Sequence, residues 1–219
     1  RVVGLTGSNG KTTLKTMLAA ILAQVGEVLA TRGNLNNDIG VPITLCRLRD
    51  EPFAVIEMGA NHAGEIAYLT DLVRPEVAVL NNAGRAHLEG FGSLEGVAHA
   101  KAEIIQGLGP DGVFVFNGDD RFADLWRELA AGRRQKTFGI HSQSDVQSPP
   151  QAYEVVWREQ RFEARFPVSC AAGQEEIRLP LVGEHNRMNA LAAIAASLEV
   201  GATLAAAVQG LAAVLPVAG

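Results

Sequence analysis

The stretch Val2–Thr13, with the sequence VVGLTGSNGKTT, decides the fold of this chain. An apolar strand leads into a glycine-rich turn, and the turn leads directly into an amphipathic helix. Backbone N–H groups of such a turn, together with the positive end of the helix dipole, bind phosphate oxygens. Lys11 can reach the outer phosphates, and the hydroxyl of Thr12 is suited to bind Mg²⁺. The stretch therefore predicts a phosphate loop formed by Gly7, Ser8, Asn9, Gly10, Lys11, Thr12 and Thr13.

This loop departs from the strict phosphate-loop pattern, which requires glycine at position 5. The chain has Leu5 there, with glycines at positions 4, 7 and 10 instead. The alternative is a strand–helix turn whose glycines serve only backbone geometry. The run Gly10-Lys11-Thr12 argues against that alternative, so the stretch is interpreted as a variant nucleotide-binding loop.

Length and composition set the class of protein. A chain of 219 residues forms one large domain or two small ones, and a net charge of −5 argues against a broad nucleic-acid surface. The absence of a long apolar run excludes a transmembrane helix, and no signal peptide is recognised. Cys46 and Cys170 fit no metal-binding spacing, so we expect reduced, buried thiols in a cytosolic protein. Both ends of the chain look like cuts through a longer polypeptide.

Apolar strands alternate with helical patterns through the first two thirds of the chain, which is typical of a parallel sheet covered on both faces. We predict a three-layer α/β fold. Around residues 142–151 we expect a surface connection, followed by a small antiparallel β portion at about 150–182 and two helices at 186–200 and 204–214. The strands expected in the parallel part are 2–5, 28–31, 53–58, 77–80, 113–116 and 137–140, and its helices lie at 14–25, 66–73, 94–108 and around 125–129.

Polar residues collect where these strands end, and ligands of open α/β sheets bind beyond the carboxyl ends of strands. Glu57 ends a buried strand, where a phosphate-loop enzyme needs a carboxylate near Mg²⁺. A purely structural role for this acid would require a cation nearby, because a buried carboxylate without a partner is costly.

Four further polar residues have ordinary interpretations on spacing alone. His87 lies in a loop and is typical of a surface histidine, and Lys101 lies on an amphipathic helix and is typical of a solvated lysine. Asn186 and Asn189 stand at a helix start, where Asn186 could serve as the N-cap.

Five segments together resemble the Mur ligase family, and among its members those that add D-alanyl-D-alanine. The segments are residues 6–12 (TGSNGKT), 33–42 (GNLNNDIGVP), 57–62 (EMGANH), 86–93 (AHLEGFGS) and 185–191 (HNRMNAL). The resemblance extends over nearly the whole chain and is weak from residue 142 to 176. It implies that residues 1–219 are the central ATP-binding domain, without the family's N-terminal UDP-binding and C-terminal domains.

The resemblance implies roles for individual residues. Thr12 and Glu57 would hold the Mg²⁺ that bridges the β- and γ-phosphates of ATP, and His87 would help to hold a second Mg²⁺. Lys101 matches the lysine that such enzymes carry as a carbamate, an anionic oxygen ligand suited to Mg²⁺. Asn186 and Asn189 would contact the adenine, and the remaining implied residues, which face the UDP-sugar-peptide, are Asn36, Asn37, Asn61 and His62.

The function implied by the resemblance is ATP-dependent peptide-bond formation in peptidoglycan precursor synthesis, a step of cell-wall biogenesis that supports cell shape and division. D-Alanyl-D-alanine would be added to UDP-N-acetylmuramoyl-tripeptide through an acyl phosphate, by a monomer in the bacterial cytoplasm. Alternatives are another Mur ligase, a folylpolyglutamate synthase-like ligase, or a nucleotide-binding module without catalysis. We expect the 219-residue chain by itself to have little or no ligase activity.

Overall fold

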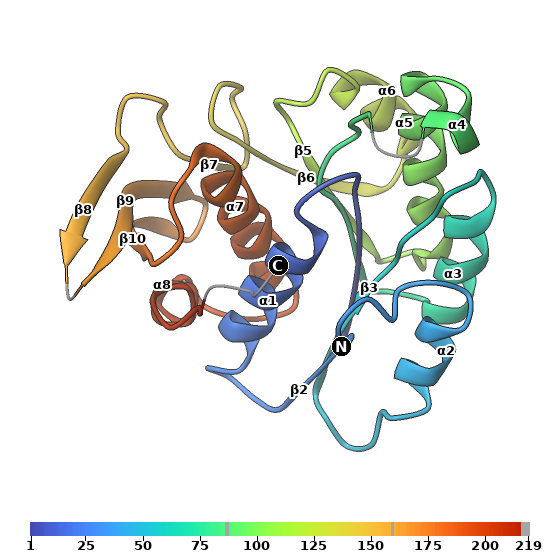
Figure 1. The fold of residues 1–219 in the computed structure, drawn as a ribbon, viewed down its shortest axis with the longest axis horizontal. Helices are drawn as coiled ribbons and strands as arrows, with labels where there is room; N and C mark the ends of the chain where they lie inside the picture. Colours follow the sequence, from blue (N-terminus) through green and yellow to red (C-terminus); the bar gives the residue numbers. More distant parts are fainter. Residues whose placement is uncertain (86–87, 159, 216–219) are drawn as a thin grey trace.

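The computed structural model describes residues 1–85, 88–158 and 160–215 (Figure 1). The parallel strands are β1 (Val2–Thr6), β2 (Val28–Ala30), β3 (Phe53–Glu57), β4 (Val77–Leu80), β5 (Val113–Asn117), β6 (Arg134–Gly139) and β7 (Val146–Gln147). The antiparallel strands are β8 (Glu154–Arg158), β9 (Arg161–Cys170) and β10 (Gly173–Leu179). In the described part of the chain they form one ten-stranded sheet with the order β10-β9-β7-β6-β5-β4-β1-β3-β2, and β8 pairs with β9.

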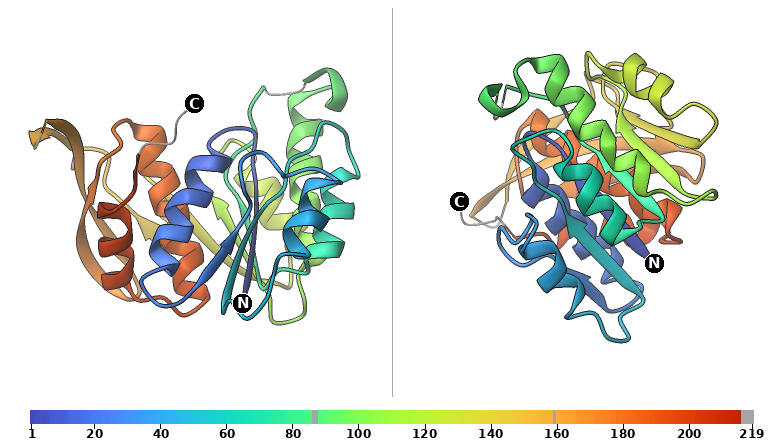
Figure 2. Two further views of the ribbon diagram at one scale, coloured as in Figure 1. Left: turned by 60° about the horizontal axis from the view of Figure 1, so that its bottom comes forward. Right: turned by 90° about the vertical axis from the view of Figure 1, so that its right-hand side faces the viewer.

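Helices cover both faces of the parallel part of this sheet (Figure 2). One layer contains α1 (Lys11–Leu22), α7 (Glu184–Glu199) and α8 (Leu204–Ala212). The other contains α2 (Gly40–Leu45), α3 (Glu65–Val73), α4 (Leu88–Phe91), α5 (Leu94–Ala102), the 3₁₀ helix η1 (Glu103–Gly107) and α6 (Ala123–Leu129). The predicted three-layer α/β architecture is therefore confirmed.

Two apolar cores lie on either side of the sheet, because successive side chains of a strand point to opposite faces. Val3 and Val55 belong to the core under α1, α7 and α8. Ile56 and Leu80 belong to the core under α3, α5 and α6. Burial on both faces explains why these strands are apolar throughout rather than alternating.

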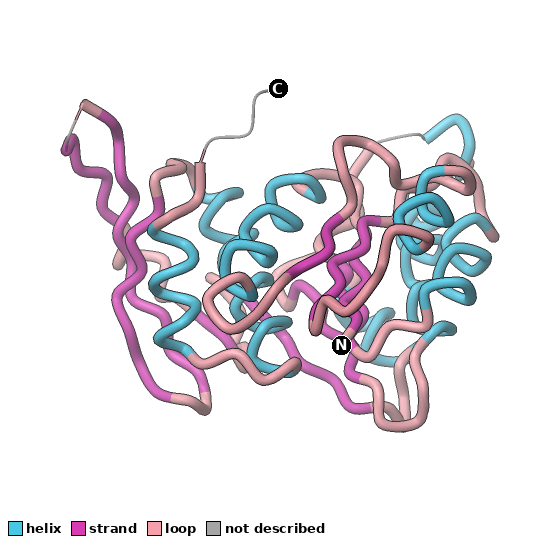
Figure 3. Tube along the Cα trace, turned by 90° about the horizontal axis from the view of Figure 1, so that it is seen from below, coloured by secondary structure: helices cyan, strands magenta, loops and turns pink. Residues whose placement is uncertain are grey.

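The antiparallel strands extend the same sheet at one end (Figure 3). Strand β9 joins them to the parallel part through a pairing of Gln147 with Ser169. Ile177 and Leu179 of β10 bury themselves in the first core, whereas Trp157 and Phe162 at the end of the β8–β9 hairpin are more than half exposed. The expected alternation of apolar and polar residues thus marks strands with one solvated face.

Three local predictions from the sequence were wrong or incomplete. The helix expected at 94–108 changes to the 3₁₀ form at Glu103, where the Thr70 hydroxyl donates to the Ile104 carbonyl at 3.1 Å. Helix α2 was not predicted, and it begins where Asn37 Oδ1 accepts the N–H of Gly40 at 2.8 Å. The connection at 142–151 forms β7 and buries Ser148 completely.

Two simpler expectations can also be checked. Cys46 is exposed and Cys170 is partly buried, so the prediction of buried thiols was wrong. Within the described ranges, no helix combines the length and apolar character needed to cross a membrane.

The topology places a ligand site at one point on the sheet. Strand β1 lies between β3 and β4, so the connections leaving β1 and β3 diverge to opposite sides. In open parallel sheets the crevice at such a switch point receives the ligand. The predicted phosphate loop follows β1 directly and leads into α1 (Figure 1), so it lies at this switch point.

Candidate active site

The loop between β1 and α1 is held in place by the segment that follows β4. The Ser8 N–H donates to the Asn82 carbonyl at 3.1 Å, and the Ser8 hydroxyl accepts the N–H of Gly84 at 2.8 Å. The Asn9 N–H donates to Asn82 Oδ1 at 2.9 Å, and the Asn82 amide returns a bond to the Asn9 carbonyl at 3.1 Å. These bonds fix the loop conformation without using the first-turn N–H groups of α1, which a helix leaves available for an anion.

Gly10 is required by the geometry of the turn. Its φ of 76° lies in the left-handed region, and a Cβ atom there would lie 2.7 Å from Asn189 Oδ1. Glycine meets both demands, because it has no Cβ and adopts positive φ without strain. The glycine of the Gly10-Lys11-Thr12 run thus lets α7 approach the loop closely.

Lys11 folds back over the loop that it follows. Its ammonium donates to the Gly7 carbonyl at 2.8 Å and approaches the Ser8 carbonyl at 3.4 Å. Burial lowers the pKa of Lys11, and the negative charge of Glu57 opposes that shift. A long side chain held by carbonyl oxygens at the loop can turn to a phosphate that enters it.

The Glu57 carboxylate lies beside the first turns of α1 and is almost fully buried. One oxygen, Oε2, is 2.9 Å from Lys15 Nζ and 3.4 Å from the Thr12 hydroxyl. The other, Oε1, accepts a hydrogen bond from the Asn36 amide at 2.8 Å. Lys15 is the cation that a structural role for Glu57 requires, so burial of this acid does not by itself indicate a metal.

A cavity of about 640 Å³ opens next to this carboxylate. It brings together Lys11 and three of the asparagines predicted to face the substrate, namely Asn36, Asn37 and Asn61. His62 is not among the lining residues; it is exposed, and its Nδ1 lies 3.0 Å from the Glu65 carboxylate. A single cavity therefore joins the end of the phosphate loop to an amide-rich wall.

Lys101 is buried behind this cavity, so the interpretation as a solvated lysine was wrong. Its ammonium lies 3.4 Å from the carbonyl of Ala60, a residue of the cavity wall, and 5.5 Å from the centre of the Phe91 ring. Burial lowers the pKa of Lys101 to about 8; the positive charge of Lys11 acts in the same direction, and Glu65 and Glu103 oppose it. The neutral fraction of this amine near physiological pH is therefore larger than that of an ordinary lysine.

Asn81 links the phosphate loop to α7. Its amide nitrogen donates to the Asn9 carbonyl at 3.1 Å and to Asn189 Oδ1 at 2.8 Å, and both asparagine side chains are buried. Asn189 thus lies beside the loop, whereas Asn186 donates to the Val182 carbonyl at 2.9 Å. Helix α7 begins at Glu184 after Gly183, so Asn186 is not its N-cap.

One predicted ligand cannot be placed. His87 lies outside the described residues, as does its neighbour Ala86. In the ranges that are described, no group of three or more His, Cys, Asp and Glu side chains is arranged to hold a metal ion. Mg²⁺ sites that bind the ion through substrate phosphates need only one or two carboxylates from the protein.

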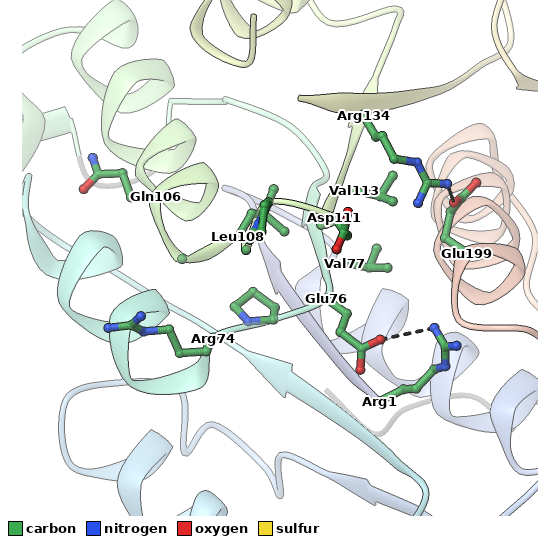
Figure 4. Close-up of a pocket in the computed structure, with 15 residues that line it drawn as sticks. Arg1, Arg74, Glu76, Val77, Gln106, Leu108, Asp111, Val113, Arg134 and Glu199 are labelled. Carbon is green, nitrogen blue, oxygen red and sulfur yellow. Dashed lines mark hydrogen bonds and ion pairs between the residues drawn. The ribbon is translucent and has the colours of Figure 1, made fainter. Parts of the chain in front are cut away.

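A second cavity, of about 600 Å³, lies at the amino ends of the parallel strands, where β4, β5 and β6 begin (Figure 4). Four of its charged side chains form two pairs: Arg1 with Glu76 at 3.1 Å, and Arg134 with Glu199 at 3.0 Å. Ligands of such sheets bind at the carboxyl ends of the strands, so a cavity at their amino ends is not the expected active site.

The comparison with known families decides the classification. The model of the Mur ligase middle domain matches residues 5–197. The chain belongs to the Mur ligase family. The match includes the phosphate loop, strand β3 with Glu57, strand β4, which Asn81 follows, and most of α7.

Several relatives that are 36–49% identical to the chain share one activity in their names. The chain is 49% identical to the UDP-N-acetylmuramoyl-tripeptide--D-alanyl-D-alanine ligase of Escherichia coli over 97% of its own length. A crystal structure of MurF from Acinetobacter baumannii superposes with a TM-score of 0.92 at 42% identity, covering 99% of this chain. A MurF ligase from Thermotoga maritima in complex with ADP superposes with a TM-score of 0.85 at 31% identity over 99% of this chain.

The chain spans about half the length of these Mur ligases. It covers 46% of the Escherichia coli enzyme, 46% of the Acinetobacter chain and 48% of the Thermotoga chain. The comparisons therefore match this chain to about half of each of these longer proteins.

Several residues of the site were not anticipated from the sequence. Lys15 follows Lys11 by one helical turn and lies among the buried residues of α1. A lysine on the apolar face of a helix is unusual, so the sequence could have indicated that it has a buried partner. Asn81 and Asn82 directly follow a buried strand. Their position predicted a polar loop there, but it did not indicate which of its side chains belong to the site. The bonds between Ser8 and Gly84 join residues far apart in sequence, and no local pattern could have indicated them.

Proposed function

We propose that this chain is the ATP-binding core of a ligase that joins D-alanyl-D-alanine to UDP-N-acetylmuramoyl-tripeptide. The observation that carries the proposal is the position of Lys11, which belongs to the phosphate loop and also lines the cavity with the three asparagines. The outermost phosphate of a nucleotide and a substrate carboxylate would meet there. Relatives of the same named activity, at 49% and 46% identity, supply the substrate assignment.

We propose that ATP binds with its phosphates at the loop and its adenine towards α7. The first-turn N–H groups of α1 and the Lys11 ammonium suit the phosphates. Asn189 lies against Gly10 and would contact the adenine. Its hydrogen bond from Asn81 fixes the orientation of its side-chain amide. Asn186, on the same helix, keeps its proposed part in adenine binding as a weaker assignment, because its amide is bonded to Val182.

The residues near the loop fit Mg²⁺ in their chemistry. Thr12 and Glu57 offer a hydroxyl and a carboxylate oxygen 3.4 Å apart, and Mg²⁺ prefers oxygen ligands. When bound, the ion would neutralise charge on the β- and γ-phosphates. His87 remains a proposed ligand of a second Mg²⁺.

Lys101 has the environment that carbamate formation needs. Carbon dioxide reacts with a neutral amine, and burial lowers the pKa of Lys101 to about 8. Reaction would replace a buried cation with an anionic oxygen ligand, next to the positive charge of Lys11. The carbamate is therefore proposed as part of the second Mg²⁺ site.

The proposed reaction proceeds in two steps. The terminal carboxylate of the tripeptide attacks the γ-phosphorus of ATP, giving an acyl phosphate and ADP. The amine of D-alanyl-D-alanine then attacks the acyl carbon, and the tetrahedral intermediate collapses to the amide with release of phosphate. Lys11 would stabilise the charge that develops on the transferring phosphoryl group. Asn36, Asn37 and Asn61 would position the peptide at the cavity wall, and His62, at the exposed rim, would contact it farther out.

The enzyme of which this chain is the core would act in the bacterial cytoplasm, as a monomer, on precursors of peptidoglycan. We further propose that residues 1–219 alone bind nucleotide but do not complete ligation, because the relatives are about twice as long. A coupled ligase assay on the 219-residue chain tests this, and robust peptide ligation would refute it.

Replacing Lys11 with alanine in the full-length protein tests the proposed role most simply. We expect substrate-dependent ADP release to fall by at least about a hundredfold, the usual effect of removing one preorganised stabilising group. Arg32→Ala is a suitable control, since Arg32 is an exposed cation outside the cavity lining. Undiminished ADP release by the Lys11→Ala variant would exclude the assignment.

A further inference from the structure

Lys15 is a buried cation for which the proposed reaction has no use. Its side chain is 6% exposed and that of Glu57 is 2% exposed, with Nζ and Oε2 2.9 Å apart. The same ammonium donates to the Gly33 carbonyl at 2.9 Å. Lys15 therefore connects α1, the strand end that carries Glu57 and the loop that carries Asn36.

The ammonium lies against the carboxylate oxygen that a metal would use. Oε2 faces both Thr12 and Lys15, whereas Oε1 is taken by the Asn36 amide. In the described part of the chain, Glu57 belongs to no group of three or more His, Cys, Asp and Glu side chains that could hold a metal ion. The single negative charge of Glu57 is thus already balanced by Lys15, and Lys11 adds a second positive charge close enough to interact with Glu57.

A divalent cation arriving alone meets no net attraction at such a site. Two like charges a few ångströms apart in a poorly solvated site repel by several kcal/mol. The phosphates of a bound nucleotide reverse the sign of the local charge, because they bring several negative charges to the loop that Lys11 follows. Metal binding then becomes favourable only when nucleotide is present.

We propose that Lys15 is a positioning residue that holds Glu57 in place and makes divalent-cation binding depend on bound nucleotide. The proposal rests on the proposed function, in that Glu57 must be a metal ligand when nucleotide is bound. The proposal has a distinctive consequence: variants that lack the positive charge of Lys15 should gain affinity for the divalent cation in the absence of nucleotide. A residue with only a structural role would give a loss.

The test measures binding of Mn²⁺, which takes the same oxygen ligands as Mg²⁺, to full-length protein by electron paramagnetic resonance, with and without ADP. We expect the wild type to bind Mn²⁺ at this site only with ADP. Lys15→Met and Lys15→Gln should bind Mn²⁺ without ADP at least about tenfold more tightly than the wild type, because a unit charge nearby is worth that much or more. Lys15→Arg keeps the charge and should behave as the wild type.

Two further variants make the outcomes distinguishable. Adding Glu57→Gln to Lys15→Met should abolish the gained Mn²⁺ binding, which assigns it to this carboxylate. Equal nucleotide-free Mn²⁺ binding by the wild type and both neutral variants would overturn the inference. If the Glu57→Gln variant binds Mn²⁺ as tightly as the wild type when ADP is present, the metal assignment in the proposed function fails instead.

Loss of folding in the neutral variants would also be informative. A divalent cation would then replace the missing ammonium beside Glu57, so millimolar Mn²⁺ should raise their melting temperature more than it raises that of the wild type. Absence of this rescue would overturn the proposal.

Discussion

The side-chain amide of Asn81 donates to Asn189 Oδ1 at 2.8 Å, and so joins residues 108 positions apart in the sequence. The same nitrogen donates to the backbone carbonyl of Asn9 in the phosphate loop. One buried amide therefore connects the end of β4, the loop and α7. The geometry of the loop and that of the proposed adenine side cannot change independently.

Asn81→Ala should weaken both folding and nucleotide binding. Two buried hydrogen bonds are lost, so we expect the free energy of unfolding to fall by about 2 kcal/mol. The affinity for ADP should fall by about tenfold or more, because Asn189 loses its fixed orientation. Chemical denaturation and calorimetric titration of the full-length protein measure the two effects.

Asn186→Ala is the matched control for this variant. Asn186 is also on α7, but its amide bonds only to the Val182 carbonyl at the surface. Its unfolding free energy should change by no more than about 0.5 kcal/mol. Equal losses of unfolding free energy in the two variants would contradict the linking role of Asn81.

The Lys15–Glu57 pair predicts strong coupling between two substitutions. Removing one partner leaves an uncompensated buried charge, so Lys15→Met and Glu57→Gln should each cost about 3–5 kcal/mol of unfolding free energy. The double variant should cost clearly less than the sum. A denaturation-based double-mutant cycle gives the coupling energy, and additive losses would show that the two side chains do not act as a pair.

Arg187 should prove important for stability rather than for chemistry. Its guanidinium is buried, donates to the Ser148 hydroxyl and the Pro149 carbonyl, and lies 5.4 Å from the centre of the Tyr153 ring. Arg187→Ala leaves these acceptors without a partner, and we expect it to cost about 3 kcal/mol or more. Arg178→Ala, which removes an exposed pair with Glu176, should cost under about 1 kcal/mol. Similar melting temperatures for the two variants would contradict this account.

Lys101 makes stability depend on pH in a defined window. Its pKa is about 8 in the folded protein against 10.5 in the unfolded chain, so between these values only the unfolded chain holds the proton. Unfolding then takes up a proton, and the free energy of unfolding rises with pH across this window. Below pH 8 both states are protonated, and the folded protein carries the full penalty of a buried charge.

Lys101→Met should remove that penalty. In carbon dioxide-free buffer at pH 7, we expect this variant to be more stable than the wild type by up to about 3 kcal/mol, the value of the pKa difference. Its stability should also lose the rise between pH 8 and pH 10.5. Parallel pH profiles for the variant and the wild type, measured by urea denaturation, would contradict the burial of a charged amine.

Local patterns were sufficient for most of the fold. Continuous apolar runs such as Val77–Leu80 predicted strands buried on both faces, and the run from Gly7 to Thr13 predicted the loop that begins α1. Helix α2 was missed because its start depends on one side chain, that of Asn37, accepting a backbone N–H. The short strand β7 could not be foreseen, because its neighbour Ser148 is buried by Arg187 from a distant helix.

The sequence indicated which residue types form the candidate site, but it indicated few of the contacts between them. The positions of Lys11 and Glu57 after two strands indicated their common location, and the family resemblance added Asn189. The buried environment of Lys101 was not visible from helical spacing, since it depends on packing against Ala60 and Phe91. The pairing of Glu57 with Lys15 required the fold, because it joins the second turn of α1 to the end of β3.

The central claim is that this chain is the core of a ligase specific for D-alanyl-D-alanine. The most direct measurement is ADP release by the full-length protein with ATP, Mg²⁺ and UDP-N-acetylmuramoyl-tripeptide, using a panel of amine substrates. We predict that D-alanyl-D-alanine gives one ADP for each peptide bond formed, and that single amino acids, glutamate included, form no peptide bond. Ligation of a single amino acid, or a lack of ligation of D-alanyl-D-alanine, would contradict this assignment.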